Sequence, residues 1–507
     1  MILLSLSVFG LTGCGGIPDI IDKPVAKARP VPSAGPLVAT SRTLARGRAK
    51  QDSSLLLLAN NKEALDWRLA LVDSARSSVD IQLYLWHESS SGRLLFDRLL
   101  KAADRGVRVR ILVDDFLFQA KEKDIAAICR YQPNLEIRIF NPTRLRGNPV
   151  GSAWEFLFNF SSLNRRMHNK TFIADRSMTI VGGRNVSDSY FGLNPDYNFF
   201  DLDVLASGPV VADVSDGFDQ FWNSAKAYPG GRLTKRGRSE DLVRIRKELA
   251  RLLEEEKDSR LKSFAIKPQS WSRKLGGLPS LIVEGRATFL QDAPNPDEDK
   301  RTVVTNLAQM TNSQKGELIF VSPYLIPSEE GIKRLGEARV KGIDIGVLAP
   351  SLAANNQAAV YGHYRKKRGP IIDQGVVLFE LKSRPGAELR SLVDTYPVRA
   401  KAVNLHAKAV VGDRSKCFVG SLNLAPRAVR INTESGLLID SPELSRELFE
   451  LIKESAGAQN AWQVSRDERG RMTWSSDDEK LKKAPKAKMS KRILSFIVGL
   501  LPIEGQL

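Results

Sequence analysis

The stretch that decides the fold reads RMHNKTFIAD at residues 166–175, followed by GGRN at residues 182–185. A second stretch repeats the pattern, with HAK at residues 406–408, an aspartate at 413 and GSLN at residues 420–423. Both copies keep H-x-K, four residues, D, six residues and G-(G/S)-x-N. The chain has only four histidines, and two of them occupy equivalent places in this pattern. The match predicts an internally repeated chain with one copy of the motif in each half.

The segments around the two motifs also match in order and kind. In the first half, residues 79–85 read as a strand, residues 94–103 as an amphipathic helix closed by Gly106, and residues 107–113 as a second strand. In the second half, residues 318–321, 331–340 and 343–348 repeat this order, with Gly342 closing the helix. Strands that alternate with helices indicate an α/β fold. We expect two pseudo-symmetric halves, each a mixed β-sheet flanked by helices, that share one active site at their interface.

The spacing within each motif indicates a site for a phosphate group. Side chains alternate between the faces of a strand, so His168 and Lys170 should project together, as should His406 and Lys408. The glycine pairs permit close approach of the backbone. The asparagines that follow them, Asn185 and Asn423, can then present amides to the same pocket. Such a pocket is cationic and rich in donors, so it needs neither a metal nor a cofactor.

The motif aspartates, Asp175 and Asp413, lie farther along the chain than the histidines and lysines. We expect them to hold structure rather than to do chemistry, although they belong to the same catalytic motif.

These paired motifs resemble the HKD motifs of the phospholipase D superfamily over most of residues 51–450. The resemblance implies a two-step reaction in which His168 is the nucleophile and His406 the general acid and base, although the symmetry leaves the reverse assignment open. It also implies that Asp201 orients the first histidine and Glu434 the second. Asp203 is an alternative to Asp201.

Several further segments are similar to bacterial cardiolipin synthases, the C type in particular: residues 83–86, 103–109, 165–170, 183–185 and 500–504. This resemblance implies a phosphatidyl transferase that makes cardiolipin from phosphatidylglycerol and a second phospholipid, with phosphatidylethanolamine as a candidate. A phospholipase D that hydrolyses phospholipids to phosphatidic acid is the first alternative, and an endonuclease of the same superfamily is the second. The sequence identifies no protein partner.

The charge of the chain restricts its partners but does not choose between lipid and nucleic acid. It has 76 Lys and Arg against 58 Asp and Glu, a formal net charge of +18. Such a surplus favours polyanionic partners, either nucleic acid or an anionic lipid surface. The resemblance above favours the lipid, so we expect no nucleic acid to bind.

The N-terminal residues resemble a bacterial lipoprotein signal. Residues 2–11 form an apolar run too short to span a bilayer, and they lead to LTGCG at residues 11–15. We expect a signal peptide over residues 1–13, lipid attachment at Cys14 and a Pro/Ala-rich tether over residues 14–50. The mature protein would then be anchored in the cell envelope and face the periplasm, with the outer membrane favoured.

The remaining boundaries follow from charge and composition. We expect one phospholipase D-like half over residues 51–235, a charged helical insert over 236–280 with Ser239 as the cap of its helix, and the other half over 281–455. Residues 456–507 form a basic tail that either lies on an anionic bilayer or packs against the domain. His363 lies beside four cations in this sequence and is either a contact for a lipid head group or a surface or hydrogen-bonded polar residue.

Overall fold

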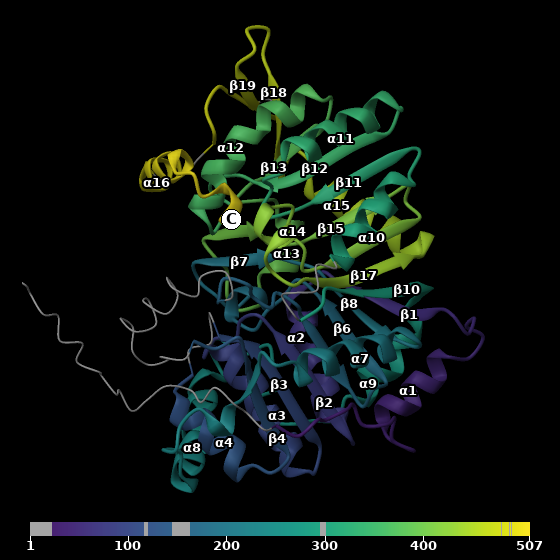
Figure 1. Ribbon diagram of the computed structural model, residues 1–507, viewed down its shortest axis with the longest axis vertical. Helices are drawn as coiled ribbons and strands as arrows, with labels where there is room; N and C mark the ends of the chain where they lie inside the picture. The colour runs from purple at the N-terminus through teal and green to yellow at the C-terminus, as the bar shows by residue number, and fades with distance from the viewer. Residues whose placement is uncertain are drawn as a thin grey trace, which may run out of the picture.

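The computed structural model describes residues 23–115, 120–143, 163–294, 301–477, 479–485, 487 and 489–507. The expected signal peptide and Cys14 lie outside these residues. Figure 1 shows two α/β halves, with the first half in purple and blue and the second in green and yellow.

Among the described residues, the sheet of the first half has eight strands. They are β1 (Ser53–Leu58), β2 (Ser78–Leu83), β3 (Arg108–Asp114), β4 (Leu135–Phe140), β5 (Thr171–Ala174), β6 (Met178–Gly182), β8 (Asp203–Ser207) and β9 (Ala227–Pro229). Their pairing gives the order β9–β4–β3–β2–β5–β6–β8–β1. Strands β2, β3 and β4 are parallel and the other pairs antiparallel, so the sheet is mixed.

The second half repeats this order and adds a hairpin. Its strands are β10 (Val283–Gln291), β11 (Glu317–Val321), β12 (Asp344–Pro350), β13 (Val377–Leu381), β15 (Ala409–Gly412), β16 (Lys416–Gly420), β17 (Ser435–Asp440), β18 (Ala461–Arg466), β19 (Met472–Ser476) and β20 (Glu479–Leu481). Their order is β10–β17–β16–β15–β11–β12–β13–β18–β19–β20. Parallel strands β11, β12 and β13 match β2, β3 and β4, which confirms the expected pseudo-symmetry.

Two strand pairs connect the halves. Strands β1 and β10 are antiparallel neighbours, with Ser54 opposite Glu284, so the two sheets form one sheet of 18 strands. Away from this sheet, β7 (Tyr197–Phe200) of the first half lies parallel to β14 (Ala402–Leu405) of the second. The β7–β14 pair brings the chain that leads to Asp201 beside the chain that leads to His406.

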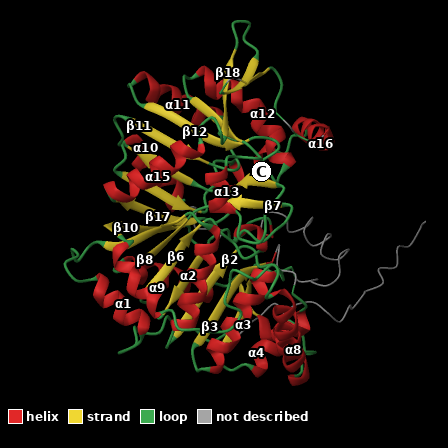
Figure 2. Cartoon of the chain, turned by 180° about the vertical axis from the view of Figure 1, so that it is seen from behind, coloured by secondary structure: helices red, strands yellow, loops and turns green. Residues whose placement is uncertain are grey.

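Helices cover both faces of the sheet (Figure 2). In the first half they are α1 (Pro36–Leu44), α2 (Asn61–Ser74), α3 (Ser90–Asp104), α4 (Glu122–Tyr131), α7 (Val210–Asn223), α8 (Ser239–Glu256) and α9 (Ser272–Gly277). In the second half they are α10 (Thr302–Asn312), α11 (Glu329–Val340), α12 (Ala358–Asp373), α13 (Ala387–Val393), α14 (Pro426–Arg430), α15 (Pro442–Ser455) and α16 (Met489–Leu500). One hydrophobic core continues through both halves, from Phe218 and Phe221 of α7 to Leu444 and Leu448 of α15.

The ends of the matched helices show why the repeat folds as it does. Ser89 caps α3 and Ser328 caps α11. Each serine side chain accepts the backbone N–H of the residue three positions later. Gly106 and Gly342 then close these helices with φ angles of 88° and 86°. Only glycine adopts this left-handed conformation without strain, so the two predicted helix ends are confirmed.

The structure corrects three expectations outside the repeat. Residues 23–50 do not form a free tether, because α1 is packed in the structure and Ala26 and Ala28 donate N–H groups to Asn223 and Asp219. Helix α8 begins at Ser239, but the side chain of Ser239 does not cap it. Instead, the side chain of Asp241 accepts the backbone N–H of Arg238.

The C-terminal boundary also differs from the expected one. Strand β18 pairs with β13 as β9 pairs with β4, so the second half continues past residue 455. The segment that stands apart from the sheet begins after β20 and contains α16.

Candidate active site

The two H-x-K segments lie just before strands β5 and β15, and not within strands as expected. The reason is that the backbone N–H of each histidine is hydrogen-bonded to the opposite half of the molecule. The backbone N–H of His168 donates to the carbonyl of Thr433 over 2.9 Å, and that of His406 donates to the carbonyl of Phe200 over 2.8 Å. Each carbonyl belongs to the residue that precedes an acidic side chain of the site.

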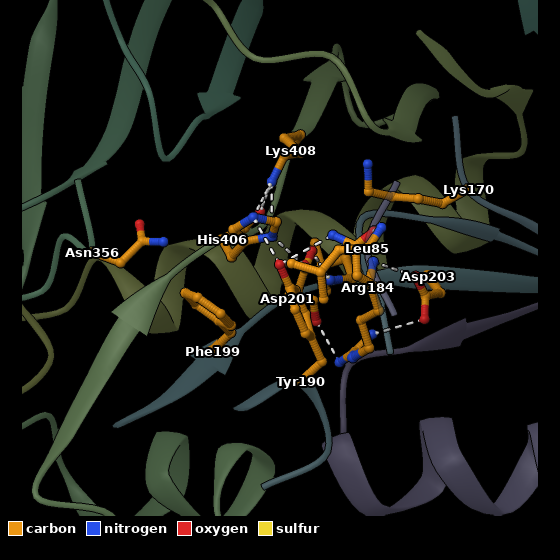
Figure 3. Close-up of polar contacts among 12 residues, drawn as sticks. Leu85, Lys170, Arg184, Tyr190, Phe199, Asp201, Asp203, Asn356, His406 and Lys408 are labelled. Carbon is orange, nitrogen blue, oxygen red and sulfur yellow. Dashed lines mark hydrogen bonds and ion pairs between the residues drawn. The ribbon is translucent and has the colours of Figure 1, made fainter. Parts of the chain in front are cut away.

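The histidines and acids are paired across the halves. His168 Nδ1 lies 2.8 Å from Glu434 Oε2, and His406 Nδ1 lies 2.6 Å from Asp201 Oδ2. Figure 3 shows the second of these pairs. The expected pairing, Asp201 with His168 and Glu434 with His406, is therefore wrong: each acid orients the histidine of the other half. All four side chains are buried.

Asp203, the alternative partner of a histidine, holds two arginines instead. Its Oδ2 lies 2.9 Å from Arg68 and 3.2 Å from Arg184. Arg184 also donates to the carbonyl of Asp201, so this buried cluster supports the loop that carries the histidine-orienting acid.

The motif lysines bring positive charge to the centre of the site. Lys170 Nζ donates to the carbonyl of His168, and Lys408 Nζ donates to that of His406. Both are buried. In Figure 3, Lys408 lies directly beside the His406 ring, and Lys170 lies farther from the ring, to the right of the view. Burial lowers the pKa of Lys170 to about 7 and that of Lys408 to about 8.

Burial and the neighbouring lysines favour the neutral form of both histidines. Burial, followed by the charge of Lys408, lowers the pKa of His406 to about 3. Burial also lowers the pKa of His168, and Lys170 and Lys408 lower it further. Lys170 also lowers the pKa of His406, so the pKa of each histidine depends on the lysine of the other half, as expected for one shared pocket.

The two acids differ in their protonation. Burial raises the pKa of Glu434 to about 8. Burial acts in the same direction on Asp201, but His406, Lys408 and Arg184 outweigh it, and the pKa of Asp201 is lowered. Asp201 is thus an ionised carboxylate that can stabilise a protonated His406.

The second residue of each G-(G/S)-x-N motif, two positions before the asparagine, touches one of the acids. A Cβ added to Gly183 would lie 2.2 Å from Asp201 Oδ1, so a side chain has no room there. In the second half, Ser421 occupies this position and its hydroxyl donates to Glu434. The difference between GG and GS in the two motifs therefore reflects how each acid is held.

The motif asparagines have different surroundings. Asn185 accepts the N–H of Leu85 and donates its amide to the Tyr190 hydroxyl over 3.1 Å. The Tyr190 oxygen also lies 3.3 Å from His406 Nε2. Asn423 is buried as well, and its Oδ1 has no hydrogen-bond partner among the described residues.

Tyr190 was not predicted from the sequence. It lies five residues after Asn185, and the equivalent position after Asn423 is Ala428, so the repeat carries no signal for it. Its hydroxyl places an alcohol oxygen beside the reactive nitrogen of His406.

Asp175 and Asp413 lie at the far ends of β5 and β15 from the histidines. The carboxylate of Asp175 accepts the N–H groups of Arg76, Ser77 and Ser78, just before β2. Asp413 does the same for residues 315–317, before β11. This geometry supports the structural role expected for both.

Within the part of the chain that the structure describes, no group of three or more His, Cys, Asp or Glu side chains is arranged to hold a metal ion. The positive charge of the site comes from its two lysines.

With this geometry established, comparison with known proteins identifies the family. Residues 69–222 and 307–455 match the family described as "Cardiolipin synthase, PLD-like domain", and the chain therefore belongs to the phospholipase D superfamily. It is 34% identical to cardiolipin synthase C of Escherichia coli over 460 residues, which cover 89% of this chain and 95% of that protein. It is 22% identical to the major cardiolipin synthase of Bacillus subtilis over 80% of this chain and 69% of that protein.

A solved structure shows the same fold. The phosphatidylserine synthase of Haemophilus influenzae superposes with a TM-score of 0.52 at 16% identity, covering 83% of this chain and 89% of that one.

Proposed function

We propose that this protein is a phosphatidyltransferase that makes cardiolipin from phosphatidylglycerol and a second phospholipid, with phosphatidylethanolamine as a candidate for the second. The observation that carries the proposal is the shared pocket: two histidines, each paired with an acid of the other half, between two buried lysines. The cardiolipin synthases to which the chain is similar support the choice of substrate.

In the first step, His168 Nε2 attacks phosphorus and the bond to the leaving alcohol breaks. His406 Nε2 gives its proton to that alcohol, and a phosphohistidine forms. In the second step, His406 takes the proton of the acceptor hydroxyl, whose oxygen attacks phosphorus and releases His168. The position of the Tyr190 hydroxyl beside His406 Nε2 supports this assignment, because the general acid and base must hold an alcohol oxygen there.

Binding of the donor lipid raises the proton affinity of His406. Burial, followed by the charge of Lys408, lowers the pKa of His406 to about 3, although Asp201 acts in the opposite direction. A phosphodiester anion between Lys170 and Lys408 offsets their charge, so its binding raises the pKa of His406. The general acid is therefore protonated when the donor lipid is bound.

The direct test uses purified protein in liposomes of phosphatidylglycerol, with and without phosphatidylethanolamine, and analysis of the products by lipid mass spectrometry. Cardiolipin should be the main product. Phosphatidic acid as the main product would make the protein a hydrolase, and efficient cleavage of DNA would overturn the lipid assignment.

We further propose that Cys14 is lipidated and holds the protein in the envelope, facing the periplasm. The described residues contain no helix that is long and apolar enough to span a bilayer. Cys14→Ser should abolish acylation, because the thioether needs that sulfur, and should move the protein out of the membrane fraction at high salt. If metabolic labelling shows the same acylation in the variant and the parent, the lipoprotein proposal fails.

A further inference from the structure

Helix α16 packs on α12 through a face made of small residues. A Cβ added to Gly362 would lie 2.3 Å from the carbonyl oxygen of Ser495, and one added to Gly499 would lie 2.8 Å from that of Gly362. His363 is buried at the same contact, with its Nε2 3.2 Å from the carbonyl of Val498. His363 is thus a buried residue of a helix contact and does not face a lipid head group. This contact fixes which side of α16 faces outward.

The outward side of α16 is apolar and exposed. Of the fifteen large hydrophobic residues that are exposed in the described part of the chain, seven lie on α16 or directly after it. They are Met489, Ile493, Leu494, Phe496, Ile497, Leu500 and Leu501, with exposed fractions of 47–70%. A monomer in water does not leave such a continuous apolar face uncovered without a partner.

The charge around this face indicates what covers it. Residues 480–503 contain seven Lys and Arg residues and no Asp or Glu. On α12, Arg365 and Lys366 are exposed, and the Arg365 guanidinium lies 5.2 Å from the centre of the Phe496 ring. Apolar side chains bordered by cations are typical of helices that lie in the surface of an anionic bilayer. A second copy of this chain would bring like charge to the same surface.

The helix is joined to the loops of the active site through the residues that follow it. Leu507 accepts the backbone N–H of Arg427 over 2.8 Å, and Gln506 accepts the amide of Asn164 over 2.7 Å. Arg427 lies four residues after Asn423, and Asn164 lies four residues before His168. Figures 1 and 2 show α16 on the same side of the molecule as β7, whose end leads to Asp201.

We infer that α16 is a membrane-docking helix, which lies flat in the surface of an anionic phospholipid bilayer and sets the active-site loops against the lipid head groups. The inference deepens the proposed function, since it assigns the surface through which the enzyme meets its substrate. Docking through α16 is separate from any lipid anchor at Cys14.

The test is binding to vesicles, with the full chain carrying Cys14→Ser in every arm so that no lipid anchor contributes. Vesicles contain either phosphatidylcholine alone or phosphatidylcholine with phosphatidylglycerol. The double variant Ile493→Ser/Ile497→Ser removes two exposed apolar side chains and leaves the contact with α12 intact. The matched control, Leu281→Ser/Val340→Ser, removes two exposed apolar residues from other parts of the surface.

We expect the parent and the control to sediment with the anionic vesicles and the α16 variant to bind on the order of tenfold more weakly. Lys482→Glu/Lys483→Glu should weaken binding to anionic vesicles only, and added salt should do the same. All variants should unfold at the temperature of the parent. In detergent micelles that deliver dispersed substrate, the α16 variant should form cardiolipin within about twofold of the parent rate, because its pocket is unchanged.

Equal vesicle binding by the α16 variant and the control would overturn the inference. A change in oligomeric state without a change in vesicle binding would assign the face to a second copy and overturn it as well. If the parent makes no cardiolipin in vesicles or micelles, the proposed function fails, while vesicle binding still decides the role of α16.

Discussion

The buried lysines Lys170 and Lys408 set the pH range in which the pocket holds a phosphodiester. Their pKa values of about 7 and about 8 mean that both are charged at pH 6 and neutral well above pH 8. A phosphodiester keeps its single negative charge throughout this range. Each lost charge-assisted contact weakens binding by about 1.5–3 kcal/mol, or roughly tenfold or more.

We therefore expect kcat/KM to fall as pH rises from 6 to 9. The value of kcat should hold to higher pH, because bound substrate raises the pKa of both lysines. Initial rates in mixed micelles, measured against pH and lipid concentration, check this. Lys408→Arg is the control, since arginine stays charged and should remove the contribution of that position to the fall. A kcat/KM that is constant over this range would contradict the assigned role of the lysines.

We expect Tyr190 to limit the access of water to His406, because its hydroxyl lies beside the reactive nitrogen of that ring. The Tyr190 hydroxyl lies 3.3 Å from His406 Nε2 and 3.1 Å from the Asn185 amide nitrogen. Tyr190→Phe removes this oxygen and leaves a site for water beside the general base. We expect the ratio of phosphatidic acid to cardiolipin to rise several-fold, as measured by mass spectrometry of the products.

The control for this change is Tyr84→Phe, because the ring of Tyr84 lies edge-on against His168 at 5.1 Å, on the side of the nucleophile. This variant should leave the product ratio as in the parent. An unchanged ratio in Tyr190→Phe, with cardiolipin still formed, would show that Tyr190 does not select between water and lipid.

Strands β5 and β15 are held in register by the aspartates at their far ends. Asp175 is buried, has a φ of 51° and accepts three successive backbone N–H groups. Asp413 has a φ of 47° and also accepts three successive backbone N–H groups, at a more exposed position. Asp175→Ala leaves buried donors without an acceptor and places alanine in the left-handed region. We expect a loss of about 2–4 kcal/mol in the free energy of unfolding, and less for Asp413→Ala.

Denaturant unfolding measures both changes. Asp175→Asn is the matched control, because asparagine tolerates this backbone conformation and keeps one acceptor oxygen. Below its melting temperature, Asp175→Ala should keep nearly full activity. A stable but inactive Asp175→Ala protein would instead make this aspartate a catalytic residue.

For these elements, the sequence predicted the strands, helices and motif residues that recur in both halves. It did not predict the side-chain pairs that form only when the two halves are in contact. The matched motifs were enough to place His168, Lys170, His406 and Lys408 in one pocket. The cross-pairing of Asp201 and Glu434 could not be predicted, because it arises from the β7–β14 pair and the Met167–Thr433 bridge, which join segments more than 200 residues apart. The exposed face of α16 likewise became visible only once its contact with α12 was known.

The chain as a whole forms one catalytic unit, because its sheet is continuous through β1 and β10 and both histidine–acid pairs join the two halves. In the proposed mechanism, one substrate phosphate needs a nucleophile from the first half and a general acid from the second. His168→Ala and His406→Ala should therefore each reduce cardiolipin formation by roughly a thousandfold or more.

A mixture of these two variants distinguishes one pocket within a chain from pockets shared between chains. Within one chain, every pocket of the mixture still lacks a histidine, so an equimolar mixture should be as inactive as either variant alone. The control is an equimolar mixture of the parent with His168→Ala, which should retain about half of the parent activity per total protein, because parent chains act independently.

Recovery of a substantial part of the parent rate in the mixture of the two variants would mean that the histidines meet across a subunit interface. In that case the β1–β10 and β7–β14 connections would have to be exchanged between two chains, as in a domain-swapped dimer. Because these connections are formed within a single chain here, we expect no recovery at any protein concentration.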